Sequence, residues 1–379
     1  MKWKIPLFKS YWEEDDINSI AKVIRRGTYW ATGPEINKFE EKISDFIGLK
    51  YALVFNSGTS ALYANFIANG VKSGEVIVPS FTFIATANSV FLVGAKPVFA
   101  EIEDETYGLD AEDVEKKITN KTKAIMPIHY GGLACRDINK IRDIAKKNDL
   151  LLIEDAAQSF GSRIKEEMVG SFGSSAMFSF CQNKVITTGE GGVVVTNSKD
   201  VYEKLKLIRS HGRVEEKQGD YFSTTDKMDY SQIGYNFRMP TMVAALGLSQ
   251  IKKINKTVKM RRENAHYMSK KLSDVNQIKT PVEPKNHYHV YQMYTIQLEN
   301  QKQRDDLQKY LSKKRIMTKV YFDPIHLKSF YKKEFGYKKG ILPKTEDSSR
   351  KVLTLPMYPS LEKPELDLIA ESIKEFFEV

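Results

Sequence analysis

Short apolar runs alternate with helix-like stretches between about residues 50 and 200. The runs that predict β-strands are Tyr51–Phe55, Glu75–Val78, Pro97–Ile102, Lys123–Ile128, Leu150–Glu154, Ala176–Phe180 and Gly192–Thr196. Helical patterns lie between them at about residues 60–69, 84–93, 111–118 and 137–147. Several runs, such as 151–153 and 193–195, are continuously apolar, which is typical of strands covered by helices on both faces. The rhythm predicts an α/β fold with a mostly parallel, helix-flanked sheet.

The pattern changes near residue 240, where Pro240 opens a long helical stretch. Fewer and more separate elements follow: a strand at Val290–Leu298, a helix at Gln303–Lys313, a strand at Ile316–Tyr321 and a last helix from Lys363. This composition is typical of a smaller α+β domain. We expect a large domain over residues 1–250 and a small C-terminal domain over residues 251–379.

Composition is that of an ordinary globular protein, with 41% hydrophobic and 28% charged residues. The net charge of +10 is spread along the chain as lysine, without a block of like charges or a nucleic-acid motif. We therefore expect no nucleic-acid partner, although an anionic, diphosphate-bearing substrate would suit the positive net charge. No apolar run approaches the ~18 residues of a membrane span, and the first residues lack a signal-peptide pattern. We expect a cytoplasmic protein without a membrane partner.

Three short segments carry candidate chemistry. The first, Asn56-Ser57-Gly58-Thr59-Ser60, joins a predicted strand to a predicted helix. Free N–H groups and the dipole at a helix N-terminus favour an anion, and a glycine lets the backbone approach it closely. The alternative is an ordinary capped helix, since Ser and Thr are preferred at that position anyway.

The second segment ends an apolar strand in the carboxylate pair Glu154-Asp155. Open α/β sheets bind ligands at the carboxyl ends of their strands. A carboxylate beside a pyridinium nitrogen keeps that nitrogen protonated, because each charge favours the other. Alternatively, Asp155 caps the turn that follows.

The third segment places Lys184 in a loop of small residues, five positions after Ser179. Schiff-base chemistry needs a lysine whose amine can be neutral, which burial encourages. The glycines that follow at 189, 191 and 192 permit close approach of backbone or ligand. The alternative is a solvated loop cation. The three segments together favour a site for pyridoxal 5'-phosphate (PLP).

In this order the segments resemble the DegT/StrS-type sugar aminotransferases, a branch of the fold type I PLP enzymes. The matching segments are Gly33-Pro34-Glu35, Ser57-Gly58-Thr59, Pro79-Ser80-Phe81-Thr82-Phe83, Pro127-Ile128-His129-Tyr130-Gly131, Glu154-Asp155-Ala156-Ala157-Gln158, Phe178-Ser179-Phe180 with Lys184, Thr188-Gly189-Glu190-Gly191-Gly192, Asn236-Phe237-Arg238, Pro324-Ile325-His326 and Leu355-Pro356. Cys181 stands where the family often has histidine or an aromatic residue, so the resemblance leaves the sugar preference open.

The resemblance implies a role for each matched residue. Lys184 would bind PLP as a Schiff base and carry the proton, and Asp155 would bind the pyridine nitrogen. The other implied cofactor contacts are Gln158 near the ring hydroxyl, Phe83 on the ring face, and Gly58, Thr59 and Ser179 at the phosphate. Asn236 would reach the phosphate of the neighbouring subunit, which implies a homodimer with shared active sites.

Candidate substrate contacts are less specific: Tyr29, Trp30, His129, Tyr321 and His326. Tyr29 and Trp30 could instead anchor the N-terminal segment, and either of His129 and His326 could be a hydrogen-bonded structural residue. The spacing of His287 and His289 could suit a metal, but no third ligand lies near them in sequence, so we expect no metal site.

The implied reaction moves an amino group, in the family usually from L-glutamate, to a nucleoside-diphosphate-linked keto sugar. Residues 169–197 read closest to relatives that aminate 4-keto-6-deoxy sugars. Two alternatives share the fold: a sugar dehydratase, whose branch carries histidine in place of the lysine, and a non-catalytic regulator. A dinucleotide-dependent oxidoreductase is disfavoured, because the first β–α turn lacks G-x-G-x-x-G.

Overall fold

A seven-stranded sheet forms the centre of the molecule in a computed structural model that describes residues 3–214 and 229–378. Its strands are β1 (Tyr51–Phe55), β2 (Glu75–Pro79), β3 (Lys96–Ala100), β4 (Thr122–Ile125), β5 (Leu151–Asp155), β8 (Ser175–Ser179) and β9 (Gly192–Thr196). Their order is β1-β9-β8-β5-β4-β2-β3. Both pairings of β9 are antiparallel and the remaining pairings are parallel.

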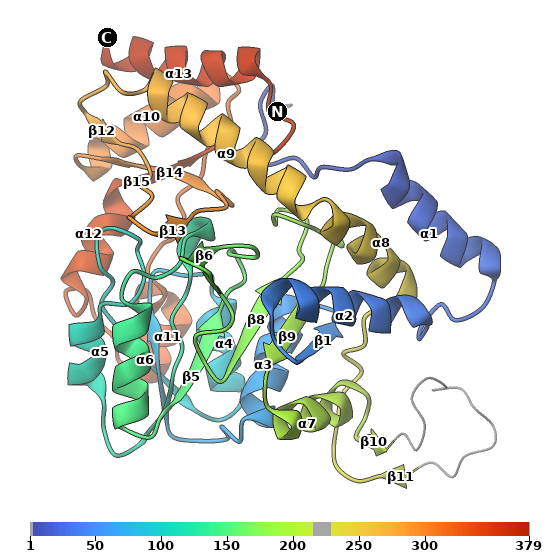
Figure 1. The fold of residues 1–379 in the computed structure, drawn as a ribbon. Coiled ribbons are helices and arrows are strands. Elements are labelled where there is room, and N and C mark those ends of the chain that lie inside the picture. The colour runs from blue at the N-terminus through green and yellow to red at the C-terminus, as the bar shows by residue number, and fades with distance from the viewer. Residues whose placement is uncertain (1–2, 215–228, 379) are drawn as a thin grey trace.

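Helices cover both faces of this sheet (Figure 1). One face packs against α2 (Pro34–Ile47), α5 (Ala111–Lys117), α6 (Ile138–Lys147) and α8 (Thr241–Lys252), and the other against α3 (Gly58–Ala68), α4 (Ala85–Leu92) and α7 (Lys199–Arg209). Successive side chains of a strand alternate between the two cores: Val54 lies in the first, and Leu53 and Phe55 lie in the second. Burial on both faces explains the continuous apolar runs, and the predicted α/β class is confirmed.

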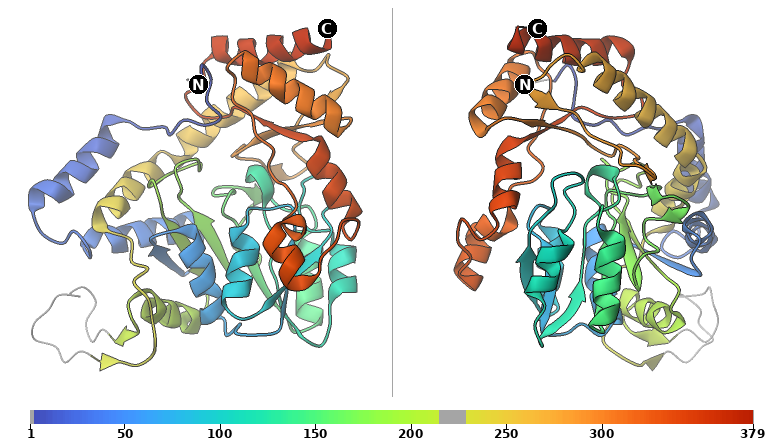
Figure 2. Two further views of the ribbon diagram at one scale, coloured as in Figure 1. Left: turned by 180° about the vertical axis from the view of Figure 1, so that it is seen from behind. Right: turned by 60° about the vertical axis from the view of Figure 1, so that its left-hand side comes forward.

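The C-terminal part forms a separate core around a three-stranded sheet of order β12-β14-β15. The strands are β12 (Ile278–Lys279), β14 (Tyr294–Leu298) and β15 (Val352–Leu355), and the covering helices are α9 (Ile254–Lys271), α10 (Gln301–Lys313) and α13 (Lys363–Phe377). In both views of Figure 2 this part lies at one end of the central sheet, with α9 running toward it.

The division near residue 250 stays a proposal. Helix α8 ends at Lys252 and α9 begins at Ile254. The start of α9 packs into the core of the large domain through Ile254 and Val258, whereas Ala265 packs into the C-terminal core. Ile5, near the other end of the chain, is fully buried in that same C-terminal core. The two cores therefore share α9 and the N-terminal segment.

A small third sheet joins the two parts. Strand β13 (His287–Tyr288) pairs with β6 (Arg163–Ile164), which forms a hairpin with β7 (Glu167–Met168). Two guanidinium groups contact the Tyr288 ring, with the Arg163 carbon 4.1 Å and the Arg262 carbon 4.2 Å from its centroid. These two cation–π contacts add to the strand pairing.

One element differs from the sequence prediction. The segment 316–321, predicted as a strand, forms only isolated bridges, from Ile316 to Ile5 and from Lys319 to Thr354.

The remaining helices and strands are α1 (Glu14–Arg26), α11 (Ser329–Phe335), α12 (Pro343–Lys351), β10 (Arg213–Val214), β11 (Asp229–Tyr230) and two 3₁₀ turns, at Tyr130–Gly132 and Ile325–Leu327. No helix in the described ranges is long and apolar enough to cross a membrane.

Candidate active site

A cavity of about 610 Å³ opens beside the carboxyl ends of β5 and β8. Its walls come from the first turns of α3 and α4, the loop after β8, and the C-terminal part of the chain. It brings together eight of the residues singled out in the sequence: Gly58, Thr59, Phe83, Asp155, Gln158, Ser179, Lys184 and Tyr321.

Lys184 lies in the loop between β8 and β9, which a backbone bond from Phe180 N to Gly191 O (2.9 Å) closes into a compact turn. The side chain borders the cavity and is otherwise enclosed by protein. Burial lowers the pKa of the Lys184 amine, and the charge of Asp155 opposes that shift only in part. The enclosure therefore favours the neutral, nucleophilic amine.

Asp155 is the last residue of β5, and only 3% of it is exposed. Thr86 Oγ1 donates a 2.7 Å hydrogen bond to its Oδ2, and the Ala157 N–H donates to its Oδ1 at 3.2 Å. Burial nevertheless raises the pKa of the Asp155 carboxyl, with the charge of Lys184 among the effects that oppose the rise. A cationic ring nitrogen beside this carboxylate would offset the cost of burying its charge.

The first turn of α3 and the end of β8 approach each other closely. Ser57 caps α3 by accepting from the Ser60 N–H at 3.1 Å. A Cβ added to Gly58 would lie 3.1 Å from Ser179 Cβ and 3.2 Å from its Oγ. Free N–H groups of a helix start thus face the cavity beside the hydroxyl groups of Thr59 and Ser179. This donor set suits a phosphate.

Two further lining residues suit a planar ring. Phe83 is 58% exposed although it lies in the cavity wall, so its ring face is available to a ligand. Gln158 is held by the Gly131 N–H, which donates to its Oε1 at 2.8 Å, so the amide keeps its N–H groups as donors. A buried carboxylate, an amine whose pKa is lowered by burial, a set of anion donors and an open aromatic face are together the groups that PLP requires.

The structure does not bring His129 and His326 to the cavity. His129 is fully buried: its Nδ1 accepts from the Cys135 N–H at 3.0 Å, so Nε2 carries the proton and donates to Glu154 at 3.0 Å. His326 is also fully buried, between Ser80 Oγ (2.7 Å) and Glu346 Oε1 (3.2 Å). Both imidazoles have the hydrogen-bonded structural arrangement that the sequence left open.

Tyr29, Trp30 and Asn236 also lie outside the cavity lining of this chain. Both aromatic residues are about half exposed, and Tyr29 borders a separate hollow of about 240 Å³. Asn236 is exposed, but its carbonyl oxygen accepts from Asn56 Nδ2 at 3.4 Å, and Asn56 precedes Ser57 and Gly58 at the start of α3. All three residues are thus exposed outside the cavity lining.

The sequence prediction missed several lining residues. Thr86 follows Phe83 by three positions, a spacing that places two residues on one face of a helical turn and that could have indicated it. Glu190 lies in the wall and accepts a 3.5 Å hydrogen bond from the Cys181 thiol. Gln292 and Lys319 come from the C-terminal part. They carried no local signal, because they join the site only through the packing of the two parts.

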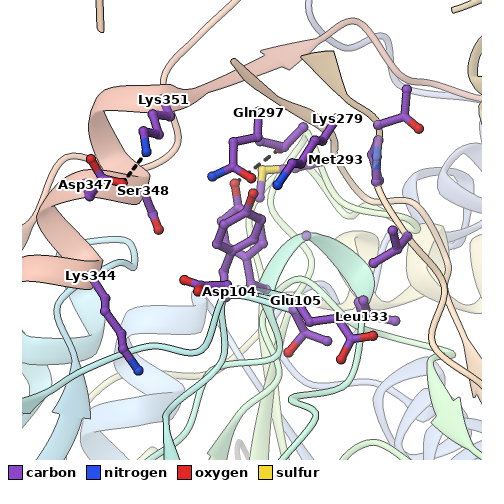
Figure 3. Close-up of a pocket in the computed structure, with 18 of the residues that line it drawn as sticks. Asp104, Glu105, Leu133, Lys279, Met293, Gln297, Lys344, Asp347, Ser348 and Lys351 are labelled. Carbon is purple, nitrogen blue, oxygen red and sulfur yellow. Dashed lines mark hydrogen bonds and ion pairs between the residues drawn. The ribbon is translucent and has the colours of Figure 1, made fainter. Parts of the chain in front are cut away.

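A second cavity, of about 690 Å³, contains none of the predicted site residues (Figure 3). Its charged lining residues are largely paired with each other or with neighbours: Lys351 with Asp347 at 2.5 Å, and Lys344 with Asp110 at 3.1 Å. Met293 lines both cavities. The larger of the two cavities is therefore not the one that Lys184 and Asp155 line.

Comparison with known proteins matches residues 11–374 to the DegT/DnrJ/EryC1/StrS aminotransferase family. The chain belongs to this family. It is 38% identical to the GDP-perosamine synthase of Escherichia coli O157:H7, over 91% of each chain. It is 33% identical to the UDP-2-acetamido-2-deoxy-3-oxo-D-glucuronate aminotransferase of Pseudomonas aeruginosa, over 93% of this chain and 94% of the relative. The structure of PseC from Helicobacter pylori, an aminotransferase involved in pseudaminic acid biosynthesis, superimposes over 100% of both chains with a TM-score of 0.91 and 30% identity.

Aminotransferases of this family depend on PLP, so the cofactor of this enzyme is PLP. The family and its sugar-specific relatives make the chain a sugar aminotransferase.

Proposed function

We propose that this enzyme transfers an amino group from L-glutamate to a nucleoside-diphosphate-linked 4-keto-6-deoxy sugar, with Lys184 and Asp155 as its catalytic residues. The observation that carries the proposal is the enclosure of both side chains at one cavity, where burial shifts the pKa of each toward its neutral form. Similarity to GDP-perosamine synthase over nine tenths of the chain supports a sugar acceptor.

Lys184 would first hold the cofactor through its amine and would then, once released, move a proton between the cofactor and the substrate carbon. Its lowered pKa suits both tasks, because a neutral amine is a nucleophile and a base. When bound, PLP supplies an electron-withdrawing ring that stabilises negative charge on the carbon bearing the nitrogen. Asp155, fixed by Thr86 and the Ala157 N–H, would keep the ring nitrogen protonated.

The remaining lining residues would orient the ring. Gly58, Thr59 and Ser179 would bind the phosphate through backbone and hydroxyl donors, and Phe83 would cover one ring face. Gln158 would donate to the ring oxygen with its amide N–H groups. Tyr321, whose carbonyl oxygen accepts a 2.6 Å bond from the Tyr130 hydroxyl, would border the sugar.

The active form would be a homodimer in which Asn236 reaches the cofactor phosphate of the neighbouring subunit. Asn236 is exposed on this chain, so its side chain is available to a partner subunit, which supports this arrangement. Tyr29 and Trp30, exposed on the same chain, are candidates to border the partner's sugar site.

The test is a panel of dTDP-, UDP- and GDP-linked keto sugars, ketone at C3 or C4, incubated with enzyme, PLP and L-glutamate. Mass spectrometry should show replacement of a ketone by an amine in a 4-keto-6-deoxy substrate, with release of equimolar 2-oxoglutarate. Loss of a hydroxyl group without gain of nitrogen would identify a dehydratase instead. Reaction of simple keto acids with no change in any sugar would refute the sugar acceptor.

A further inference from the structure

One wall of the cavity is the segment from Lys319 to Lys328, which crosses from the C-terminal part to the cavity mouth. Lys328 Nζ donates to Asp323 Oδ2 at 2.8 Å, so its charge is matched within the segment. The lining lysines are these two and Lys184, which the proposed function assigns to the cofactor. Of the two that remain, Lys319 is the one for which no carboxylate of the described residues lies within 4.0 Å.

The backbone that carries Lys319 is fixed at three points. Its N–H donates to Thr354 O at 3.1 Å, and its carbonyl oxygen accepts from the Thr354 N–H at 2.8 Å. The second point is Tyr321, whose carbonyl oxygen accepts from the Tyr130 hydroxyl. The third is Ile325, whose N–H donates to Ser80 O at 2.9 Å. A cation on such a backbone has a defined position before any substrate arrives, which reduces the entropic cost of binding.

The ammonium itself is held over an aromatic ring. Lys319 Nζ lies 4.9 Å from the centroid of Tyr321, a cation–π contact that leaves the three N–H donors free for an acceptor. The Lys319 side chain is exposed where it lines the cavity, whereas Lys184 is half-buried. A fixed, unmatched cation at the rim is an anion-binding arrangement.

We propose that Lys319 binds the diphosphate group of the nucleotide-linked sugar, an inference that rests on the proposed function. A nucleotide sugar separates its anionic group from the reacting ketone by the width of the sugar ring. A rim cation can therefore meet the diphosphate while the ketone carbon lies near Lys184. The proposed donor, L-glutamate, is much shorter, and its α-carboxylate is borne by the carbon that reacts, so this group belongs deeper in the cavity, near Lys184. Lys319 is thus a specificity residue for the acceptor.

The experiment compares holoenzyme variants Lys319→Ala and Lys319→Arg with Lys313→Ala, an exposed lysine at the end of α10 outside the cavity lining. Isothermal titration calorimetry measures the Kd of dTDP, UDP, GDP and inorganic diphosphate. Rapid-mixing absorbance follows each half-reaction separately, with L-glutamate or with the aminated sugar product. Lys319→Ala should raise the nucleoside-diphosphate Kd and the sugar KM by about tenfold or more, the loss typical of one charge-assisted hydrogen bond.

The glutamate half-reaction should keep its rate and KM, Lys319→Arg should retain most of the affinity, and Lys313→Ala should match the wild type. An unchanged Kd and sugar KM in Lys319→Ala would overturn the inference, as would a defect confined to glutamate. These outcomes are distinguishable from failure of the proposed function, in which the wild-type enzyme itself aminates no nucleotide-linked sugar.

Discussion

The Thr86 hydroxyl donates a 2.7 Å hydrogen bond to Asp155 Oδ2, and both groups are buried. The two residues come from α4 and β5, so the bond fixes the carboxylate by an element other than its own strand. The bond also lowers the pKa of Asp155 against the larger effect of burial, which raises it. Thr86 is thus a positioning residue for the proposed cofactor-binding carboxylate.

Replacing Thr86 with valine removes this donor at nearly constant volume. We expect the pKa of Asp155 to rise further, PLP to dissociate faster, and kcat to fall by about tenfold, the effect of one lost hydrogen bond to a charged group. Cofactor dissociation measured by absorbance after dilution checks this. Thr86→Ser, which restores the hydroxyl, should behave like the wild type; equal PLP retention in Thr86→Val would contradict the positioning role.

Adjacent carboxylates on β5 should give opposite phenotypes. Glu154 points away from Asp155 and accepts from His129 and from the Gly170 and Gly173 N–H groups, the last two at 2.8 Å. Glu154→Gln should therefore lower the free energy of unfolding by about 2 kcal/mol, because an amide cannot accept all three bonds. Denaturant unfolding of the apoprotein measures it.

Asp155→Asn loses one of two accepted hydrogen bonds but also removes a buried charge, so the free energy of unfolding should fall less than in Glu154→Gln. The kcat should fall by about 10² or more, since the amide cannot keep the ring nitrogen protonated. Steady-state kinetics with L-glutamate measure the loss. Equal activity of Asp155→Asn and the wild type would remove the carboxylate from the mechanism.

Replacing Lys184 with alanine should abolish covalent attachment of the cofactor. Borohydride reduction followed by intact mass should show no adduct, and turnover should fall by about 10³-fold or more. Lys184→Arg keeps a cation but has no amine that can form the link, so it should be equally inactive. A borohydride-stable adduct in the alanine variant would place the reactive lysine elsewhere.

His289 gives a pH-dependent stability. It is 4% exposed, and burial lowers its pKa to about 4. The unfolded chain has the higher histidine pKa, near 6.5, so it binds more protons between the two values and stability falls as the pH drops through this range. We expect the free energy of unfolding to fall by about 3 kcal/mol from pH 6.5 to 4 on account of this residue. The difference between wild type and His289→Gln, followed by denaturant unfolding at each pH, isolates it; parallel pH curves would contradict the prediction.

Local patterns predicted the central sheet and the residues along its strand ends, because strand periodicity and carboxyl-end positions follow directly from short segments. Lys184 and Asp155 were found in this way, and they do meet at one cavity. The sequence leaves the roles of His129 and His326 open. Only the fold shows that their imidazoles are hydrogen-bonded to the buried carboxylates of Glu154 and Glu346. Lys319 had no signal, because its strand pairing with Thr354 and its place at the cavity depend on how the two cores pack.

The ring of Tyr288, in contact with the guanidinium groups of Arg163 and Arg262, ties the C-terminal part to a hairpin that begins five residues after Gln158. A tilt of the C-terminal part on substrate binding would pull on this hairpin and hence on the amide proposed to donate to the cofactor ring. Occupancy of the sugar site and affinity for the cofactor would then be energetically linked, and linkage of this kind acts equally in both directions.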